Sequence, residues 1–330
     1  MKQLSTTQQQ LIQLLNDQKC HSGNELGKIL NISRTAIWKQ ITQLIELGIP
    51  IQPIAQQGYQ LTQPFKLLDE ERIGDGLKCA NFPQPFALHI FSSIDSTNKF
   101  LKELSPSHLI EICCAEKQTQ GRGRFGRQWY SPFGENIYCS SRWDLHCDLN
   151  KLSGLSLVVS LAIVNVLKTL VPSEELRVKW PNDILWKDQK LCGILIEILA
   201  ESNSNAQVII GIGLNINSDT QKHPLPDREW CSLYEITKDH FDRNLIVIAI
   251  LKELSVYMQR FLEHGLNDFI SEWNDYDYLA GKNITVLHQS THQLNGIARG
   301  INAEGLLIVE EDTGQTHYLS SGDTTLRQEG

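Results

Sequence analysis

The sequence predicts a multidomain protein of mixed α and β structure, in which a small helical module precedes a larger α/β domain and a short all-β domain. Its 330 residues exceed what one typical core contains, which indicates two or three domains. Short amphipathic helices and a hairpin fill the first part of the chain, and short β runs separated by Gly, Asn and Asp turns fill the last. We expect the domains to cover residues 1–64, 65–278 and 279–330.

Composition limits the classes of protein that are possible. The chain is 41% hydrophobic and 21% charged with a formal net charge of -8, as in an ordinary globular protein. Its polar start is unlike a secretory signal, and its longest apolar stretch, 155–167, is too short to span a bilayer. The eight cysteines are scattered without a C-x-x-C pattern. We therefore expect a cytoplasmic protein with free thiols and no membrane partner.

Three short helices are expected in the first 48 residues. The first covers residues 7–17, and the second begins at Ser22, which forms a capping box with Glu25. Ser33 caps the third helix, which Gly48 ends. The positions expected to be buried on the second and third helices are Leu26, Ile29, Leu30, Ile37, Ile41, Leu44 and Ile45.

A hairpin with strands at 51–55 and 59–61 follows, and it completes the pattern of a winged helix-turn-helix. Polar side chains on the open face of the third helix can contact phosphates and base edges in a major groove. A three-helix packing module that binds no DNA is the alternative. Residues 1–64 hold five basic and three acidic side chains. This small net positive charge allows few phosphate contacts per subunit and favours a dimer on a palindromic site. The expected DNA contacts are Ser22, Ser33, Arg34, Thr35, Trp38 and Lys39.

The middle of the chain alternates between strands and helices. Its strands are expected at 88–92, 110–116, 136–143, 177–180, 190–199 and 207–212, and its helices at 95–104, 152–170 and 245–261. Four β runs at 284–287, 296–299, 306–309 and 316–319 then predict a small β-barrel.

A basic loop at residues 121–127 stands out because it concentrates three arginines and three glycines in an acidic protein. Glycine lets the backbone approach a ligand closely, and arginine matches phosphate or carboxylate in a bidentate manner. The ring of Trp129, two residues later, suits a stacked purine. The loop therefore predicts an anion-binding site, with a merely solvated basic loop as the alternative.

The spacing Gly121-x-Gly123-x-x-Gly126 also satisfies a dinucleotide-binding fingerprint. That fingerprint must open a helix whose N-terminus binds the pyrophosphate. The following residues, 129–134, contain Pro and Gly close together and predict a loop instead.

Three further segments place polar groups where elements begin or end. The segment 96–98 opens a helix, where hydroxyls and free N–H groups serve either a ligand or an ordinary cap. The segment 179–183 is a turn in which Asn182 can contact an adenine or ribose and Asp183 can bind Mg²⁺, although a plain turn is equally compatible. Lys190 begins a nearly apolar strand, where it either reaches solvent or contacts a phosphate.

Four motifs, in order behind the winged helix, closely resemble those of the biotin-protein ligases: GRGRFGRQW-SPFG at 121–134, KWPND at 179–183, KLCGILIE at 190–197 and GIGLNIN at 211–217. The N-terminal region is similar to that of the bifunctional form, the biotin operon repressor and ligase. The resemblance implies an α/β (α+β) catalytic domain related to class II aminoacyl-tRNA synthetases and lipoate ligases, and an SH3-like C-terminal domain. It also implies formation of biotinyl-5'-adenylate from biotin and ATP, and biotin transfer to a lysine of biotin carboxyl carrier protein.

Site residues follow from this resemblance. Biotin is expected to contact Ser96, Thr97, Asn98, Gln118, Gly121, Arg122, Gly123, Arg124, Lys190 and Gly193. Trp129, Asn182 and Asn215 are expected to border the nucleotide. Arg122, Arg124 and Lys190 supply the positive charge that a reaction between two anions needs, and Asp183 binds Mg²⁺ or orients the acceptor amine.

The resemblance further implies partners and regulation. The acceptor is the biotin carboxyl carrier subunit of acetyl-CoA carboxylase, and the adenylate is a corepressor whose binding favours a homodimer on the biotin operator. Phe125 replaces an arginine common in the family, and the wing sequence at 56–58 lacks a common lysine, so both dimerisation and DNA binding are expected to differ in strength. A repressor that senses a ligand without turning it over, and a lipoate-type ligase, are the alternative functions.

Overall fold

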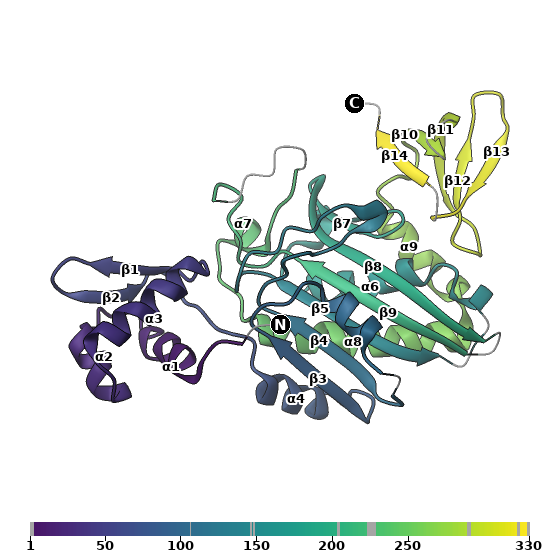
Figure 1. The fold of residues 1–330 in the computed structure, drawn as a ribbon. Coiled ribbons are helices and arrows are strands. Elements are labelled where there is room, and N and C mark those ends of the chain that lie inside the picture. Colours follow the sequence, from purple (N-terminus) through teal and green to yellow (C-terminus); the bar gives the residue numbers. More distant parts are fainter. Residues whose placement is uncertain are drawn as a thin grey trace.

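The computed structural model describes residues 3–105, 107–145, 147, 149–202, 205–222, 229–288, 292–321 and 324–328. It contains a small helical body at the N-terminus, a large body around one long sheet, and a small β body near the C-terminus (Figure 1). Within these ranges, no helix is both long and apolar enough to cross a membrane.

The predicted winged helix-turn-helix is confirmed. Its helices α1, α2 and α3 cover Thr6–Leu15, Gly23–Leu30 and Arg34–Glu46, and the wing strands β1 and β2 cover Ile51–Ile54 and Gly58–Leu61. A serine hydroxyl caps each helix by accepting a hydrogen bond from a backbone N–H of the first turn. The caps at Ser22 and Ser33 are the reason that the starts of α2 and α3 could be located from the sequence.

Two of the expected core positions of this body are wrong. Ile29 is 55% exposed and Ile45 is 37% exposed, whereas Leu26, Ile37 and Leu44 are completely buried. Ile45 lies about 100° around the helix from Leu44, at the edge of the apolar stripe. A three-helix body covers only one face of each short helix, so residues at the edge of the stripe remain open to solvent.

The large body is built on a seven-stranded sheet with strand order β3-β4-β5-β9-β8-β7-β6. Only the β3–β4 pair is parallel. The strands are β3 Phe86–Phe91, β4 Ile110–Ala115, β5 Ile137–Leu145, β6 Leu176–Lys179, β7 Asp183–Trp186, β8 Gln189–Ser202 and β9 Asn205–Leu214. The short strand β7, directly after the KWPND turn, had not been predicted as an element of its own.

The large body also contains α-helices. They are α4 Glu70–Cys79, α5 Thr97–Glu103, α6 Leu155–Leu167, α7 Leu233–Thr237, α8 Arg243–His264 and α9 Ile270–Tyr276. Every residue of α6 except Ser156 and Asn165 is buried, and α6 packs against α8 behind the strands (Figure 1). The predicted helix at 152–170 was too long, because Gly154 begins α6 in a left-handed conformation with φ 81°. Helix α4 was missed, because its glycines and charges hide its apolar positions.

The C-terminal body is a five-stranded antiparallel sheet of order β13-β12-β11-β10-β14. The predicted β structure is confirmed, and a fifth strand near the end of the chain is added. The strands are β10 Asn283–His288, β11 His292–Ile301, β12 Leu307–Glu310, β13 Thr316–Leu319 and β14 Thr324–Gln328. This body is tied to the KWPND turn, since the buried Trp180 indole donates to the backbone oxygen of Gly305 at 3.1 Å.

The link between the helical body and the sheet passes next to the basic loop. Phe65, which follows β2, stacks on Phe133 with ring centroids 6.4 Å apart. A buried ion pair between Glu116 and Arg243, 2.7 Å apart, lies beside this link. Arg243 also donates to the backbone oxygen of Lys66 at 2.7 Å. These contacts give the loop that begins near Glu116 and ends near Phe133 a fixed position at both ends.

Candidate active site

The basic loop 121–127 and the next two residues, Gln128 and Trp129, form a closed turn, hereafter the arginine loop. The N–H of Gly123 donates to the oxygen of Arg127 at 2.7 Å, and the N–H of Trp129 donates to the oxygen of Gly121 at 2.9 Å. Its tip is a three-residue 3-10 turn, in which Phe125 has φ 55°. No helix follows the glycines, so the loop prediction is confirmed and the dinucleotide fingerprint is excluded.

The arginine loop closes one side of a cavity of about 550 Å³. The other walls come from the start of α5, the turn between β6 and β7, and strands β8 and β9. The predicted site residues that line this cavity are Ser96, Thr97, Asn98, Gln118, Arg122, Gly123, Arg124, Trp129, Asn182, Asp183, Lys190 and Gly193. The structure thus brings together residues that lie far apart in the sequence.

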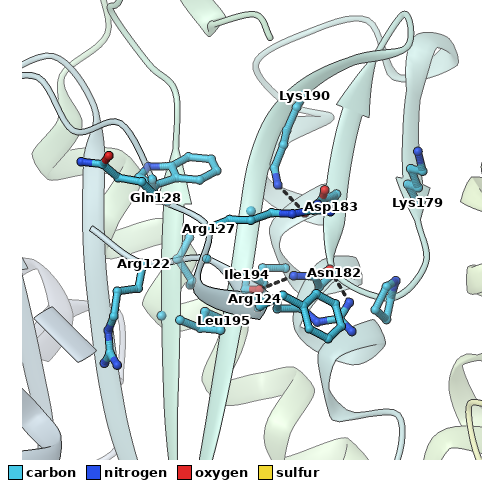
Figure 2. Close-up of a pocket in the computed structure, with 18 of the residues that line it drawn as sticks. Arg122, Arg124, Arg127, Gln128, Lys179, Asn182, Asp183, Lys190, Ile194 and Leu195 are labelled. Carbon is cyan, nitrogen blue, oxygen red and sulfur yellow. Dashed lines mark hydrogen bonds and ion pairs between the residues drawn. The ribbon is translucent and has the colours of Figure 1, made fainter. Parts of the chain in front are cut away.

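Hydrogen bonds and an ion pair connect the charged residues at one end of this cavity (Figure 2). The Lys190 ammonium lies 2.6 Å from a carboxylate oxygen of Asp183. The Arg124 guanidinium donates to the Asn182 side-chain oxygen at 3.2 Å, and Asn182 donates in turn to the backbone oxygen of Ile194 at 2.6 Å. Arg124 also donates to the backbone oxygen of Ser321 in the C-terminal body.

Positive charge is crowded at this end. Burial lowers the pKa of the Arg124 guanidinium, and the nearby Arg127 acts in the same direction while Asp183 opposes it. Burial likewise lowers the pKa of the Lys179 ammonium, and Lys190 adds to this effect. Burial disfavours the charged form of these groups, and an anion that binds beside them stabilises that form. This end of the cavity therefore suits a polyanion such as a triphosphate.

The floor of the cavity is made by two glycines that face each other across the β8–β9 pair. Gly193 and Gly213 are register partners, and the Trp129 ring lies on them. A Cβ atom on Gly213 would lie 2.5 Å from the indole, and one on Gly193 would lie 2.8 Å from it. The Lys190 ammonium is 5.2 Å from the centre of the same ring. Only glycine at both positions lets this indole lie against the sheet.

The opposite wall is polar but largely uncharged. Ser96, Thr97 and Asn98 at the start of α5 are at most 4% exposed. The Thr97 N–H donates to the Gln118 side-chain oxygen at 2.9 Å. The Ser140 hydroxyl, 2.6 Å from the Asn98 side-chain oxygen, donates to it. Such a wall can bind a neutral group that both donates and accepts hydrogen bonds.

Two predicted residues lie outside the cavity lining. Gly121 begins the arginine loop, and a Cβ atom there would meet the backbone oxygen of Trp129 at 2.6 Å. Asn215 borders a separate space of about 50 Å³ with Trp129 and Lys190. Its amide donates to the backbone oxygens of Lys190 and Cys231, at 3.3 and 3.1 Å, so this side chain stabilises the β8–β9 end.

Sequence reasoning missed several lining or supporting residues. Lys179, the first residue of the KWPND motif, lines the cavity, and so does Arg127, the third arginine of the predicted anion-binding loop. Ser140 is completely buried in β5, and its role depends on contact with residues 42 and 43 positions away. Glu197 was visible as a charge inside the apolar strand that Lys190 begins, but its partners could not be inferred.

The expected DNA contacts gather on one surface of the helical body. Arg34, Thr35, Trp38 and Lys39 are exposed on α3, and Trp38 is 58% exposed. The hydroxyls of Ser22 and Ser33 cap α2 and α3, accepting from the N–H groups of Glu25 and Ala36. An exposed tryptophan beside two cations on one helix is compatible with a nucleic-acid surface.

Comparison with known proteins agrees with this organisation. A model of the Biotin/lipoate A/B protein ligase family matches residues 90–215, an HTH domain model matches residues 7–60, and a Biotin protein ligase C terminal domain model matches residues 280–327. The chain is 35% identical over 320 residues to the bifunctional ligase/repressor BirA of Salmonella typhimurium, and the match covers 96% of each chain. It is 31% identical over 319 residues to BirA of Bacillus subtilis, covering 94% of this chain and 96% of that one.

A solved structure with the same fold is the biotin protein ligase from Aquifex aeolicus in complex with biotin and ATP. It aligns with a TM-score of 0.62 and 28% identity over 73% of this chain and 99% of its own. Fold, site and family models together define a biotin/lipoate-type ligase that carries a helix-turn-helix domain, and the predicted fold class is confirmed. The near full-length identity is more specific: the chain belongs to the bifunctional biotin ligase/repressor family.

Proposed function

We propose that this chain activates biotin with ATP and transfers it to a lysine of the biotin carboxyl carrier subunit of acetyl-CoA carboxylase. The observation that carries this proposal is the division of the cavity into a cationic end and a polar, uncharged wall. A neutral ureido ring suits the wall formed by Ser96, Thr97 and Asn98, while the acid's carboxylate and a triphosphate suit the end with Arg124 and Lys190.

The chemistry follows from that arrangement. A carboxylate oxygen of biotin attacks the α-phosphorus of ATP, a new O–P bond forms, and pyrophosphate leaves. The lysine amine of the carrier then attacks the biotinyl carbonyl carbon, an amide forms with loss of a proton, and AMP leaves. Two anions must meet in the first step, so Arg124 and Lys190 act by supplying positive charge fixed in advance. The Arg122 guanidinium, which was expected to do the same, contacts Glu197 instead. The arginine loop encloses the mixed anhydride and excludes water from it.

We assign the nucleotide to the glycine floor. The Trp129 ring, which lies against Gly193 and Gly213, supplies a flat surface on which adenine can stack, and Asn182 lines the same cavity. Asp183 carries a carboxylate oxygen besides the one that contacts Lys190. One carboxylate together with substrate phosphates is a usual way to bind Mg²⁺, and this donor set fits it. The ion would neutralise phosphate charge. The alternative role of Asp183 is to orient the acceptor lysine amine.

Pyrophosphate release from ATP and Mg²⁺ tests the ligase, with biotin, lipoate and octanoate compared in parallel. We expect release with biotin only. Release with lipoate or octanoate instead would favour the lipoate-type ligase. No release with any acid would favour the repressor that senses a ligand without turning it over.

We further propose that the adenylate-bound protein forms a homodimer and represses the biotin operon through the exposed face of α3. The support is the family membership and the exposed side chains Arg34, Trp38 and Lys39. Operator binding should require biotin and ATP together, and deletion of residues 1–64 should abolish it while adenylate synthesis continues. Operator binding that is equally strong without either substrate would argue against the corepressor role.

A further inference from the structure

A carboxylate on β8 has no part in the function proposed above, although it contacts two of the residues assigned to that site. We propose that Glu197 is a positioning residue that ties the arginine loop to the polar wall of the cavity. This inference rests on the proposed ligase function and adds a residue to its machinery. The side chain of Glu197 is 20% exposed, which places it at the border between the buried wall and solvent.

The inner contact of Glu197 is with Asn98. The Asn98 amide nitrogen lies 2.9 Å from the Glu197 oxygen Oε2 and donates to it, and the same nitrogen lies 3.3 Å from the backbone oxygen of Leu195. The Asn98 oxygen accepts from Ser140 at 2.6 Å. A Cβ atom at Gly211 would lie 2.1 Å from that oxygen, so there is little room for another orientation of the amide. Glu197 therefore helps to determine which polar groups Asn98 presents.

The outer contact of Glu197 is with the arginine loop. The Arg122 guanidinium lies 3.2 Å from the same oxygen, Oε2, and the Arg122 side chain is 42% exposed. Arg122 points away from the cluster of Arg124, Asn182 and Asp183 (Figure 2). Its backbone pairs with Gln128 across the loop, so anchoring Arg122 also anchors the strand that returns to Trp129. One carboxylate oxygen thus joins the loop to the wall.

These two contacts need different properties of Glu197. The Asn98 amide needs only an acceptor, which a glutamine oxygen also provides. The Arg122 guanidinium gains from the negative charge, which glutamine lacks. Glu197→Gln therefore weakens the outer contact alone, and Glu197→Ala removes both. A merely structural role would give the two variants the same kinetic defect in different degrees.

The experiment compares wild type, Glu197→Gln and Glu197→Ala by the KM for biotin in pyrophosphate release and by the rate at which preformed biotinyl-adenylate leaves the enzyme. We expect Glu197→Gln to speed release about threefold to fivefold, the scale of an exposed ion pair, with the biotin KM within about twofold of wild type. We expect Glu197→Ala to raise the biotin KM about tenfold as well, the scale of a hydrogen bond to a charged group.

The matched control is Lys102→Gln. Lys102 also lies near Glu197, at 3.7 Å, but it is half exposed and does not line the cavity. Both readouts should stay within about twofold of wild type in this variant. Circular dichroism and thermal unfolding establish that each variant is folded.

A double-mutant cycle of Arg122→Gln with Glu197→Gln gives a second, independent test. The release rate of the double variant should match that of either single variant, because both remove the same contact. The inference would be overturned if the fold-changes in release rate of the two single variants multiplied in the double variant. It would also be overturned if both Glu197 variants had the release rate and biotin KM of wild type. An inactive wild type would instead defeat the proposed function on which it depends.

Discussion

The DNA-facing surface and the ligase cavity are assembled in different ways. The surface candidates Arg34, Thr35, Trp38 and Lys39 come from one helix and project outward, with few shared partners. The cavity draws on several distant parts of the chain, and several of its side chains share partners through hydrogen bonds. The free-energy changes of substitutions on the surface should therefore be additive, whereas those of substitutions in the cavity should be coupled.

The two regions also differ in how their charged side chains are solvated and in how closely their residues are packed. On α3 the charges are solvated, so each contributes modestly and depends on salt. In the cavity, burial lowers the pKa of Arg124 and of Lys179, and closely packed glycines leave no room for a methyl group. Four predictions, taken from the largest expected effect to the smallest, test this contrast.

Arg124→Ala should have the largest effect. It removes a half-buried cation that contacts Asn182, and we expect retention of biotinyl-adenylate to weaken by about 2 to 4 kcal/mol, as when a preorganised donor is removed from an active site. The measurement is the adenylate release rate. Arg299→Ala, which breaks an exposed ion pair with Glu310, is the control and should leave this rate unchanged. Equal rates for Arg124→Ala and wild type would remove Arg124 from the site.

Gly213→Ala should weaken ATP binding next most strongly. Its Cβ would lie 2.5 Å from the Trp129 ring, so the indole must shift, at a cost of about 1 to 3 kcal/mol. We expect a higher KM for ATP together with a lower melting temperature. Gly74→Ala on α4 is the matched control, since nothing lies within 4 Å of its Cβ position. That change should stabilise the protein by about 0.5 to 1 kcal/mol and leave the KM for ATP alone. Identical behaviour of the two variants would contradict the glycine floor.

Arg34→Ala and Lys39→Ala test the additive surface. Each should reduce the salt dependence of operator binding by about one unit of slope, because each removes one phosphate contact. The free-energy losses of the double variant should equal the sum of the single losses within about 0.5 kcal/mol. Electrophoretic mobility shifts over a salt series measure both quantities. Strong coupling between these two positions would show that the surface is built like the cavity.

The smallest expected effect is the pH-dependent stabilisation of the N-terminal body by His21. Burial acts to lower the pKa of His21, but hydrogen bonds and charges from Asp17 and Glu25, at 3.0 and 3.4 Å, outweigh it and raise the pKa above 6.5. A raised folded pKa means that this stabilisation is complete below pH 6.5 and is lost as the pH rises through the folded value. An NMR titration of His21 measures that pKa. A value at or below 6.5 would show that the carboxylates of Asp17 and Glu25 do not outweigh the effect of burial.

Much of the fold was predictable because its signals are local. The capping serines Ser22 and Ser33 located the helices of the N-terminal body, since a cap depends on residues three positions apart. The all-apolar run of α6 marked a helix inside a large domain. Local signals failed where burial depends on neighbours, as for the exposed Ile29 and Ile45, and where an element is short, as for β7.

The candidate site was predictable in its parts and unpredictable in its connections. The motifs pointed to Arg124, Trp129, Asn182 and Lys190, all of which lie at the cavity. The motifs could not indicate that Asn215 contacts backbone oxygens at the edge of a separate space. Nor could they indicate that Ser140, in the middle of a strand, contacts Thr97 and Asn98.

The sequence by itself determined which chemical groups are available: a loop of glycines and arginines, turns that end strands, and serines that begin helices. These depend on covalent identity and on neighbours within a few residues. The tertiary structure alone decided that Gly193 faces Gly213 beneath Trp129, and that one oxygen of Glu197 receives both Asn98 and Arg122. Strand register and loop closure bring such partners together across as many as 99 residues, and no local pattern encodes that distance.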